Sequence, residues 1–170
     1  MSILTESTIV MVDDNIDEIF LTRRHVRRDG IINRFVSEKK PERLIQTLDE
    51  LVQMGVDKSS FVILLDINMP RINGFDTLRK LRANKDYSDV LVFMLSASND
   101  ENDMIEAKEL GSDGYLVKPF SSHEFFTELQ YISRVKKKIY NNADASTSRQ
   151  NNAVDFNDSA YGGDAISAIA

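Results

Sequence analysis

Short apolar segments alternate with helical patterns along most of the chain, and this alternation limits the fold more than any other feature. Five apolar segments recur: TIVMV (8–12), RFV (34–36), FVILL (61–65), VLVFML (90–95) and GYLV (114–117). Three of them are continuously apolar, as expected for strands that are covered on both faces. The repeated alternation predicts an α/β fold with a parallel sheet, right-handed crossovers and helices on both faces.

Helix signals lie between the strands. Residues 17–29 and 41–54 carry the first two helical patterns, and an apolar stripe at residues 75, 78 and 81 marks the third. Two capping-box patterns, Ser98 to Glu101 and Ser121 to Glu124, predict the starts of the fourth and fifth helices.

Composition excludes several classes of protein. The chain has 170 residues, of which 42% are hydrophobic and 28% charged, as in an ordinary globular domain. A net charge of -6 argues against a nucleic-acid surface, and the lack of cysteine excludes disulfides and thiolate metal sites. The chain has neither a secretory leader nor a segment long enough to span a bilayer, so we expect a cytoplasmic protein without a membrane association. Residues 6–140 form the expected domain, and residues 141–170 are predicted to be a flexible polar tail without an output domain.

Chemically active side chains follow four of the five apolar segments. The first segment ends in Asp13 and Asp14, the third in Asp66, the fourth in Ser96 and the fifth in Lys118. Because the carboxyl ends of parallel strands meet at one edge of a sheet, where ligands bind in such folds, these groups are expected to converge.

Three carboxylates in one place need a compensating positive charge. Two carboxylates about 4 Å apart repel by roughly 4 kcal/mol at an effective dielectric constant near 20. Lys118 supplies one positive charge, and oxygen ligands favour Mg²⁺ or Mn²⁺ over zinc. Beside such a metal, Asp66 is a natural nucleophile toward phosphorus, and Lys118 and Ser96 would bind phosphoryl oxygens.

Four sequence blocks, MVDDN, ILLDINMPRINGFD, MLSAS and GYLVKPF, resemble the signature blocks of the two-component response regulator receiver domain, over roughly residues 6 to 135. The resemblance implies a flavodoxin-like, doubly wound fold of five strand–helix units with strand order 2-1-3-4-5. It also implies that Asp66 is the phosphoacceptor. Mg²⁺ would be held by Asp13, Asp14, Asp66 and the backbone carbonyl of Asn68.

The resemblance assigns further roles. Ser96 would be the switch hydroxyl and Tyr115 the switch aromatic, while the Lys118–Pro119 peptide bond would be cis and direct Lys118 into the site. Asn68 and Ser98 stand at the positions that tune the lifetime of the acyl phosphate in the family.

The implied function is a single-domain response regulator of a phosphorelay, a phosphoprotein that catalyses only its own phosphorylation and dephosphorylation. Its partners would be a histidine kinase or histidine phosphotransfer protein and a downstream protein target, with no direct DNA binding. A homodimer could form through the fourth helix, fifth strand and fifth helix. A haloacid-dehalogenase-like, Mg²⁺-dependent phosphatase or phosphotransferase is the alternative, although that family requires an aspartate where Asn68 stands. Arg23, Arg24, Arg27 and Arg28 are either a solvated helix face or a docking site for a partner.

Overall fold

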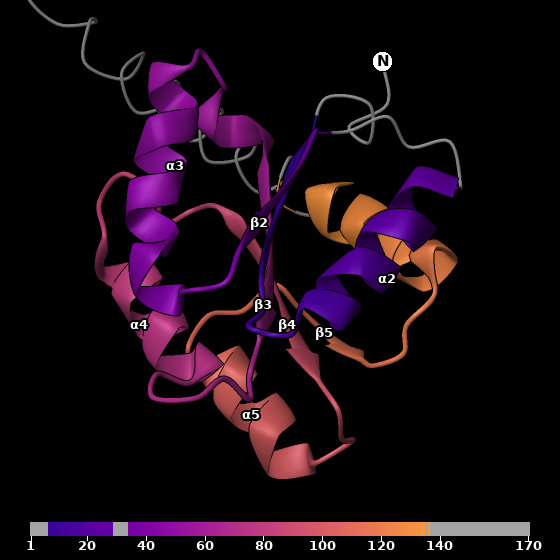
Figure 1. The fold of residues 1–170 in the computed structure, drawn as a ribbon. Helices are drawn as coiled ribbons and strands as arrows, with labels where there is room; N and C mark the ends of the chain where they lie inside the picture. The colour runs from indigo at the N-terminus through magenta and orange to yellow at the C-terminus, as the bar shows by residue number, and fades with distance from the viewer. Residues whose placement is uncertain (1–6, 29–33, 135, 137–170) are drawn as a thin grey trace, which may run out of the picture. The chain divides into compact units, whose positions relative to one another are not determined.

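The computed structural model describes residues 7–28, 34–134 and 136, and its centre is a parallel sheet (Figure 1). The strands are β1 (Thr8–Val12), β2 (Arg34–Glu38), β3 (Phe61–Asp66), β4 (Leu91–Ser96) and β5 (Gly114–Val117). Their order across the sheet is β2-β1-β3-β4-β5, which confirms the predicted order and the flavodoxin-like, doubly wound fold. All residues of β1 and β3 are buried, as their continuous apolar character predicts for central strands.

The helices connect the strands as expected. They are α2 (Ile16–Arg28), α3 (Leu44–Gln53), α4 (Gly74–Ala83), α5 (Glu101–Glu109) and a helix over residues 122–134, with short 3₁₀ segments η1 (Pro41–Arg43) and η2 (Lys58–Ser60). The capping box at Ser121 is supported, because the Ser121 hydroxyl accepts a 3.1 Å hydrogen bond from the Glu124 N–H. The one at Ser98 is wrong: Asp100 caps α5 by accepting from the Asn102 N–H, and the Ser98 N–H donates to Ser96 instead.

Helices cover both faces of the sheet (Figure 1), and an apolar core lies between each helical layer and the sheet. One core joins α3, α4 and α5 to the sheet; it includes Leu48, Leu78 and Ala107. The other joins α2 and the helix over residues 122–134 to the opposite face; it includes Ile19 and Phe125. Alternate residues of β1 and β3 enter the two cores, which is the period of two that a strand requires.

The described residues up to Ser133 form one compact unit. The predicted domain limit at residue 140 and the tail at 141–170 lie outside the described residues. Among the described helices, none combines the length and apolar character needed to cross a bilayer.

Arg82, near the end of α4, joins the loop before β4 to the loop before β5. Its guanidinium donates to the carbonyl oxygens of Ser88, Val90 and Gly111 at 2.8–2.9 Å and to the Asp113 carboxylate at 3.0 Å. Burial lowers the pKa of Arg82, and the charge and hydrogen bond of Asp113 oppose that shift.

We expect Arg82→Met to lower the free energy of unfolding by about 3 kcal/mol, because it removes three hydrogen bonds to backbone carbonyl groups and the ion pair with the largely buried Asp113 carboxylate. Urea denaturation measures the loss. Arg79→Met is the matched control, since Arg79 pairs with Asp76 and Glu106 at exposed positions and such pairs contribute about 1 kcal/mol or less. Equal losses in the two variants would contradict a special role for Arg82.

Candidate phosphorylation site

Three carboxylates meet at the carboxyl edge of the sheet, as the sequence predicted. Val12 lies opposite Leu65 in the β1–β3 pairing, so the two strands end in step and Asp13 follows beside Asp66. One oxygen from each of Asp13, Asp14 and Asp66 lies within 4.8 Å of the others. Asp13 and Asp66 are 1% and 5% exposed, whereas Asp14 is exposed, so two of the charges are held away from water.

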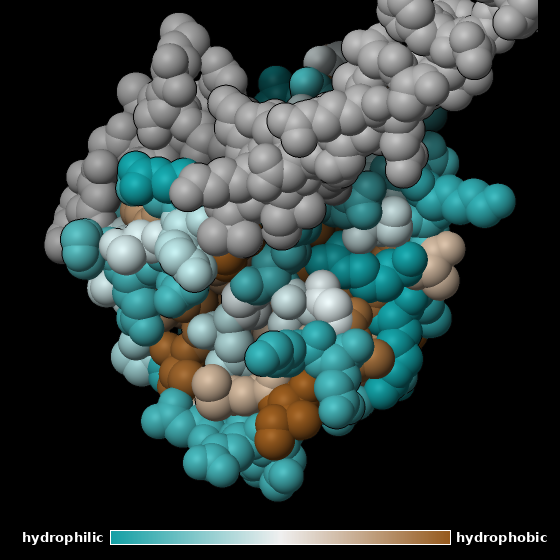
Figure 2. Space-filling view, turned by 180° about the vertical axis from the view of Figure 1, so that it is seen from behind, coloured by the Kyte–Doolittle hydropathy of each residue, from teal (hydrophilic) through white to brown (hydrophobic). Residues whose placement is uncertain are grey.

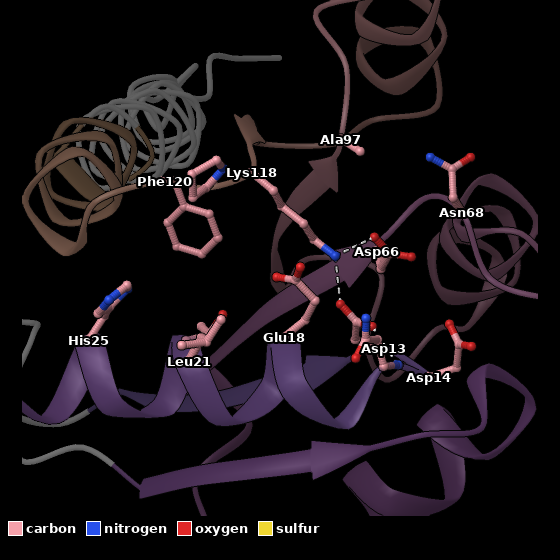
Figure 3. A pocket seen from close by; sticks show the side chains of 13 residues that line it. Asp13, Asp14, Glu18, Leu21, His25, Asp66, Asn68, Ala97, Lys118 and Phe120 are labelled. Carbon is pink, nitrogen blue, oxygen red and sulfur yellow. Dashed lines mark hydrogen bonds and ion pairs between the residues drawn. The ribbon is translucent and has the colours of Figure 1, made fainter.

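Lys118, just beyond β5, completes this cluster. Its Nζ lies 2.7 Å from Oδ2 of Asp13 and 2.7 Å from Oδ1 of Asp66, as the dashed lines in Figure 3 show. Its backbone N–H donates to the Ser96 carbonyl at 2.8 Å, which fixes the strand end, and the Lys118–Pro119 peptide bond is cis. Because Asp13 also accepts a 2.8 Å hydrogen bond from the Asn15 N–H, both of its oxygens are engaged.

The electrostatic balance of the cluster remains negative, since three carboxylates face one ammonium group. Burial raises the pKa of Asp66; Lys118 opposes the shift, and the charges of Asp13 and Asp14 add to it. Burial alone would lower the pKa of Lys118, but its hydrogen bonds and charge interactions with Asp13 and Asp66 outweigh burial and raise it. The ionised site is therefore under-compensated and favours a further cation.

The raised pKa of Asp66 predicts a pH-dependent stability. The folded chain binds a proton on the Asp66 carboxyl more tightly than the unfolded chain does. The free energy of unfolding therefore falls as the pH rises from about 4 through the folded-state pKa of Asp66. We expect Asp66→Asn, in metal-free buffer at pH 7, to raise the free energy of unfolding by an amount on the order of 1 kcal/mol. The gain should vanish below about pH 4, where both states are protonated. Urea denaturation at several pH values tests this, and a gain that is independent of pH would contradict the electrostatic cause.

A pocket of about 640 Å³ opens above the carboxylates and extends along α2. Its lining includes Asp66, Asn68, Ala97 and Lys118, together with residues of α2 that the sequence analysis did not assign to the site: Glu18, Leu21, Thr22 and His25. Figure 3 shows Glu18 extending from α2 into this pocket and His25 at its outer end. These residues are spaced at i, i+3, i+4 and i+7, which places them on one face of a helix. This spacing could have shown from the sequence that they line the same side of the pocket.

The predicted switch residues lie together beside the pocket. The Ser96 side chain is fully buried, and its Oγ accepts a 3.1 Å hydrogen bond from the Ser98 N–H. The Tyr115 hydroxyl lies 3.4 Å from the Ser98 carbonyl oxygen, so Ser96 and Tyr115 both contact the same loop. Ala97, rather than Ser96, contributes to the pocket lining. Burial raises the pKa of Tyr115, so its hydroxyl stays protonated as a donor.

The donor set fits a divalent oxygen-preferring cation. Asp13, Asp14 and Asp66 supply carboxylate oxygens, and Asn68 lines the same pocket. Among the residues that the structure describes, these three aspartates form the one group of histidine, aspartate or glutamate side chains that lie close enough together to bind the same metal ion. Carboxylate and carbonyl ligands suit Mg²⁺ and Mn²⁺, and two positive charges would offset the excess negative charge.

Comparison with known proteins identifies the family. The chain is 29% identical to the transcriptional regulatory protein ResD of Bacillus subtilis over 143 residues, 84% of this chain and 55% of that protein. It is 31% identical to the transcriptional regulatory protein CpxR of Escherichia coli K12 over 126 residues, 74% of this chain and 49% of that protein. The chain thus spans about half the length of these curated relatives.

A solved structure and a family model agree with these relatives. The two component response regulator from Cytophaga hutchinsonii shares the fold with a TM-score of 0.67 at 24% identity, over 76% of this chain and 98% of that one. The model of the response regulator receiver domain matches residues 9–130. This range contains all five strands apart from Thr8, the first residue of β1, and it includes Asp13, Asp14, Asp66 and Lys118. The chain therefore belongs to the response regulator receiver domain family.

Proposed function

We propose that this receiver domain accepts a phosphoryl group from a phosphohistidine onto Asp66 and thereby changes its binding to a partner. The observation that carries the proposal is the buried Asp66 carboxylate at a strand end, 2.7 Å from Lys118 and within 4.8 Å of Asp13 and Asp14. The donor would be a histidine kinase or a histidine phosphotransfer protein. The single-domain interpretation and the absence of DNA contact stay predictions.

In the proposed transfer, an oxygen of Asp66 attacks phosphorus, an Asp66 O–P bond forms and the P–N bond to the donor imidazole breaks. Lys118 already contacts Asp66 and lies where its ammonium can follow the negative charge onto the phosphoryl oxygens. Hydrolysis later cleaves the acyl phosphate with water, which restores the carboxylate and releases phosphate. The domain in this scheme catalyses only its own phosphorylation and dephosphorylation.

Mg²⁺, or Mn²⁺, would supply charge neutralisation for the incoming phosphoryl oxygens. Asp14 and Asp66 would hold it directly, with the backbone carbonyl of Asn68 and, partly through water, Asp13. Asn68 and Ser98 would set how long the acyl phosphate survives. Asn68 lines the pocket and is exposed, and Ser98 is also exposed, so both positions are open to water.

The output would begin at Ser96. Ser96 would move away from Ser98 so that its hydroxyl donates a hydrogen bond to a phosphoryl oxygen, and Tyr115 would then fill the space that Ser96 vacates. Phosphorylation would in this way change the face formed by α5, β5 and the helix over residues 122–134. That face would bind the downstream target or a second copy of the chain.

The decisive experiment compares the wild type with Asp66→Asn, treated with a small phosphodonor such as acetyl phosphate in the presence or absence of Mg²⁺. Phosphate-affinity gels and intact-mass spectrometry report the modification. We expect one phosphoryl group per wild-type chain, dependent on Mg²⁺, and none on Asp66→Asn. Steady release of phosphate far beyond one equivalent, at enzyme-like rates, would favour the haloacid-dehalogenase-like alternative, and an unmodified wild type would refute the proposal.

A further inference from the structure

The outward side of α2 carries a basic groove that is separate from the phosphorylation pocket. Phe20, Arg23, Arg24 and Arg27 line this groove, which has a volume of about 410 Å³. The residues of α2 that line the phosphorylation pocket are different ones, Glu18 among them. At 3.6 residues per turn the two sets lie on roughly opposite sides of the helix. Partner docking at the phosphorylation site would require the arginines to border that site, and they do not.

The groove combines an exposed apolar side chain with three arginines, one of which is held against the sheet. Phe20 is 62% exposed and Ile16, one turn before it, is 58% exposed. The guanidinium of Arg23 stacks 5.1 Å above the Phe35 ring and lies 3.4 Å from the Ser37 hydroxyl, so this wall is held against β2. Arg24 and Arg27 have no ion-pair partner within the described residues, and both can engage an incoming anion.

The outward side of α5 has a net negative charge around a similar apolar centre. Ile105 is 56% exposed; Glu101 and Glu109 flank it one turn away on each side, and Lys108 is the one exposed cation on this helix. Figure 2 shows hydrophobic residues among hydrophilic ones at the lower end of this view, where α5 lies in Figure 1. Ala107 is the only buried residue of α5, so most of this helix is available for contacts.

The two surfaces cannot meet within one copy, because α2 packs on one face of the sheet and α5 on the other. Contact between α5 of one copy and the α2 groove of another joins two different surfaces, so it is a heterologous, head-to-tail contact. Two exposed apolar side chains, Phe20 and Ile105, would be covered in each such contact, with carboxylates on one helix facing guanidinium groups on the other.

We propose that α5 of one copy docks in the groove formed by Phe20, Arg23, Arg24 and Arg27 of a second copy. Ile105 packs against Phe20, and the acidic rim of α5 pairs with Arg24 and Arg27. A contact made by one helix from each copy is small, so the self-association is weak, with a dissociation constant on the order of 100 µM. This inference does not depend on phosphorylation, and its test uses the unphosphorylated protein.

The test uses two variants that each disable one half of the contact. The α2 variant carries Arg24→Glu and Arg27→Glu, and the α5 variant carries Ile105→Lys and Glu109→Lys. A third protein, Lys39→Glu with Lys85→Glu, has the same net charge as the α2 variant but changes exposed lysines elsewhere. Circular dichroism and thermal unfolding establish that all of them fold. Sedimentation equilibrium over a concentration series from about 10 µM to about 1 mM measures the mass.

We expect the wild type and the lysine control to associate with rising concentration at low salt, and each disabled variant to stay monomeric. An equimolar mixture of the two disabled variants should form a dimer and nothing larger, because one intact α5 then meets one intact α2 groove. Added salt should weaken all of these contacts by screening. A wild type that stays monomeric, an α2 variant that still associates, or a mixture that does not pair would each overturn the proposal. Dimerisation of the α2 variant alone would instead indicate a symmetric contact through α5.

Discussion

Replacing Lys118 by methionine should slow phosphorylation of Asp66 about 100-fold, the usual loss when one charged donor to a transition-state oxyanion is removed. The same change should lower the free energy of unfolding by about 3 kcal/mol in metal-free buffer at pH 7. Both effects have one cause. Lys118 is bonded at 2.7 Å to Asp13 and to Asp66, whose side chains are 1% and 8% exposed, so its removal leaves two buried carboxylates without their cation.

Rates of modification by a small phosphodonor and urea denaturation measure the two effects of Lys118→Met. Mg²⁺ should restore part of the lost stability, because it offsets the same carboxylates. Lys85→Met is the matched control, since Lys85 is exposed on another surface and should change neither quantity. If Lys118→Met were phosphorylated at the wild-type rate, Lys118 would have no part in the transfer, whatever its effect on stability.

Gly74→Ala should destabilise the fold by about 3 kcal/mol, because the first residue of α4 lies against the backbone of Asp66. A β-carbon at Gly74 would collide with the carbonyl oxygen of Asp66 and would lie 2.9 Å from Cα of Ile67. These contacts are with backbone atoms, which cannot rotate away as a side chain can. The Gly74 N–H also donates to the Ile67 carbonyl at 2.9 Å, so α4 and the end of β3 would have to separate.

Thermal or urea unfolding of Gly74→Ala tests this contact, and Gly55→Ala serves as its control. Gly55 has a φ of 87° and no atom within 4 Å of a β-carbon, so its substitution adds only backbone strain of about 1 kcal/mol. Gly74→Ala should also slow phosphorylation, because it displaces Asp66, whereas Gly55→Ala should not. A loss at Gly74 no larger than at Gly55 would show that β3 and α4 adjust without cost.

The sequence by itself determined the fold class and the convergence of the acidic cluster, whereas the strand order followed from the resemblance to the receiver domain family and was confirmed by the structure. Short, continuously apolar segments between helical patterns indicate strands covered on both faces, and the residues that follow parallel strands must meet at one edge. Asp13, Asp66 and Lys118 could therefore be placed together without coordinates. The cap of α5 could not, because Ser98 and Asp100 are both good capping residues, and the Ser98 N–H is drawn instead to the buried hydroxyl of Ser96.

Tertiary structure alone decided which side chains surround the cluster and which surfaces stay open. Glu18 and His25 enter the pocket because the packing of Ile19 and Val26 in the core fixes the rotation of α2 about its axis. The same rotation turns Phe20 and Arg27 outward into a separate groove, although all these residues belong to one short helix. A helical pattern shows which residues share a face, but the direction of each face depends on long-range packing that the local sequence does not contain.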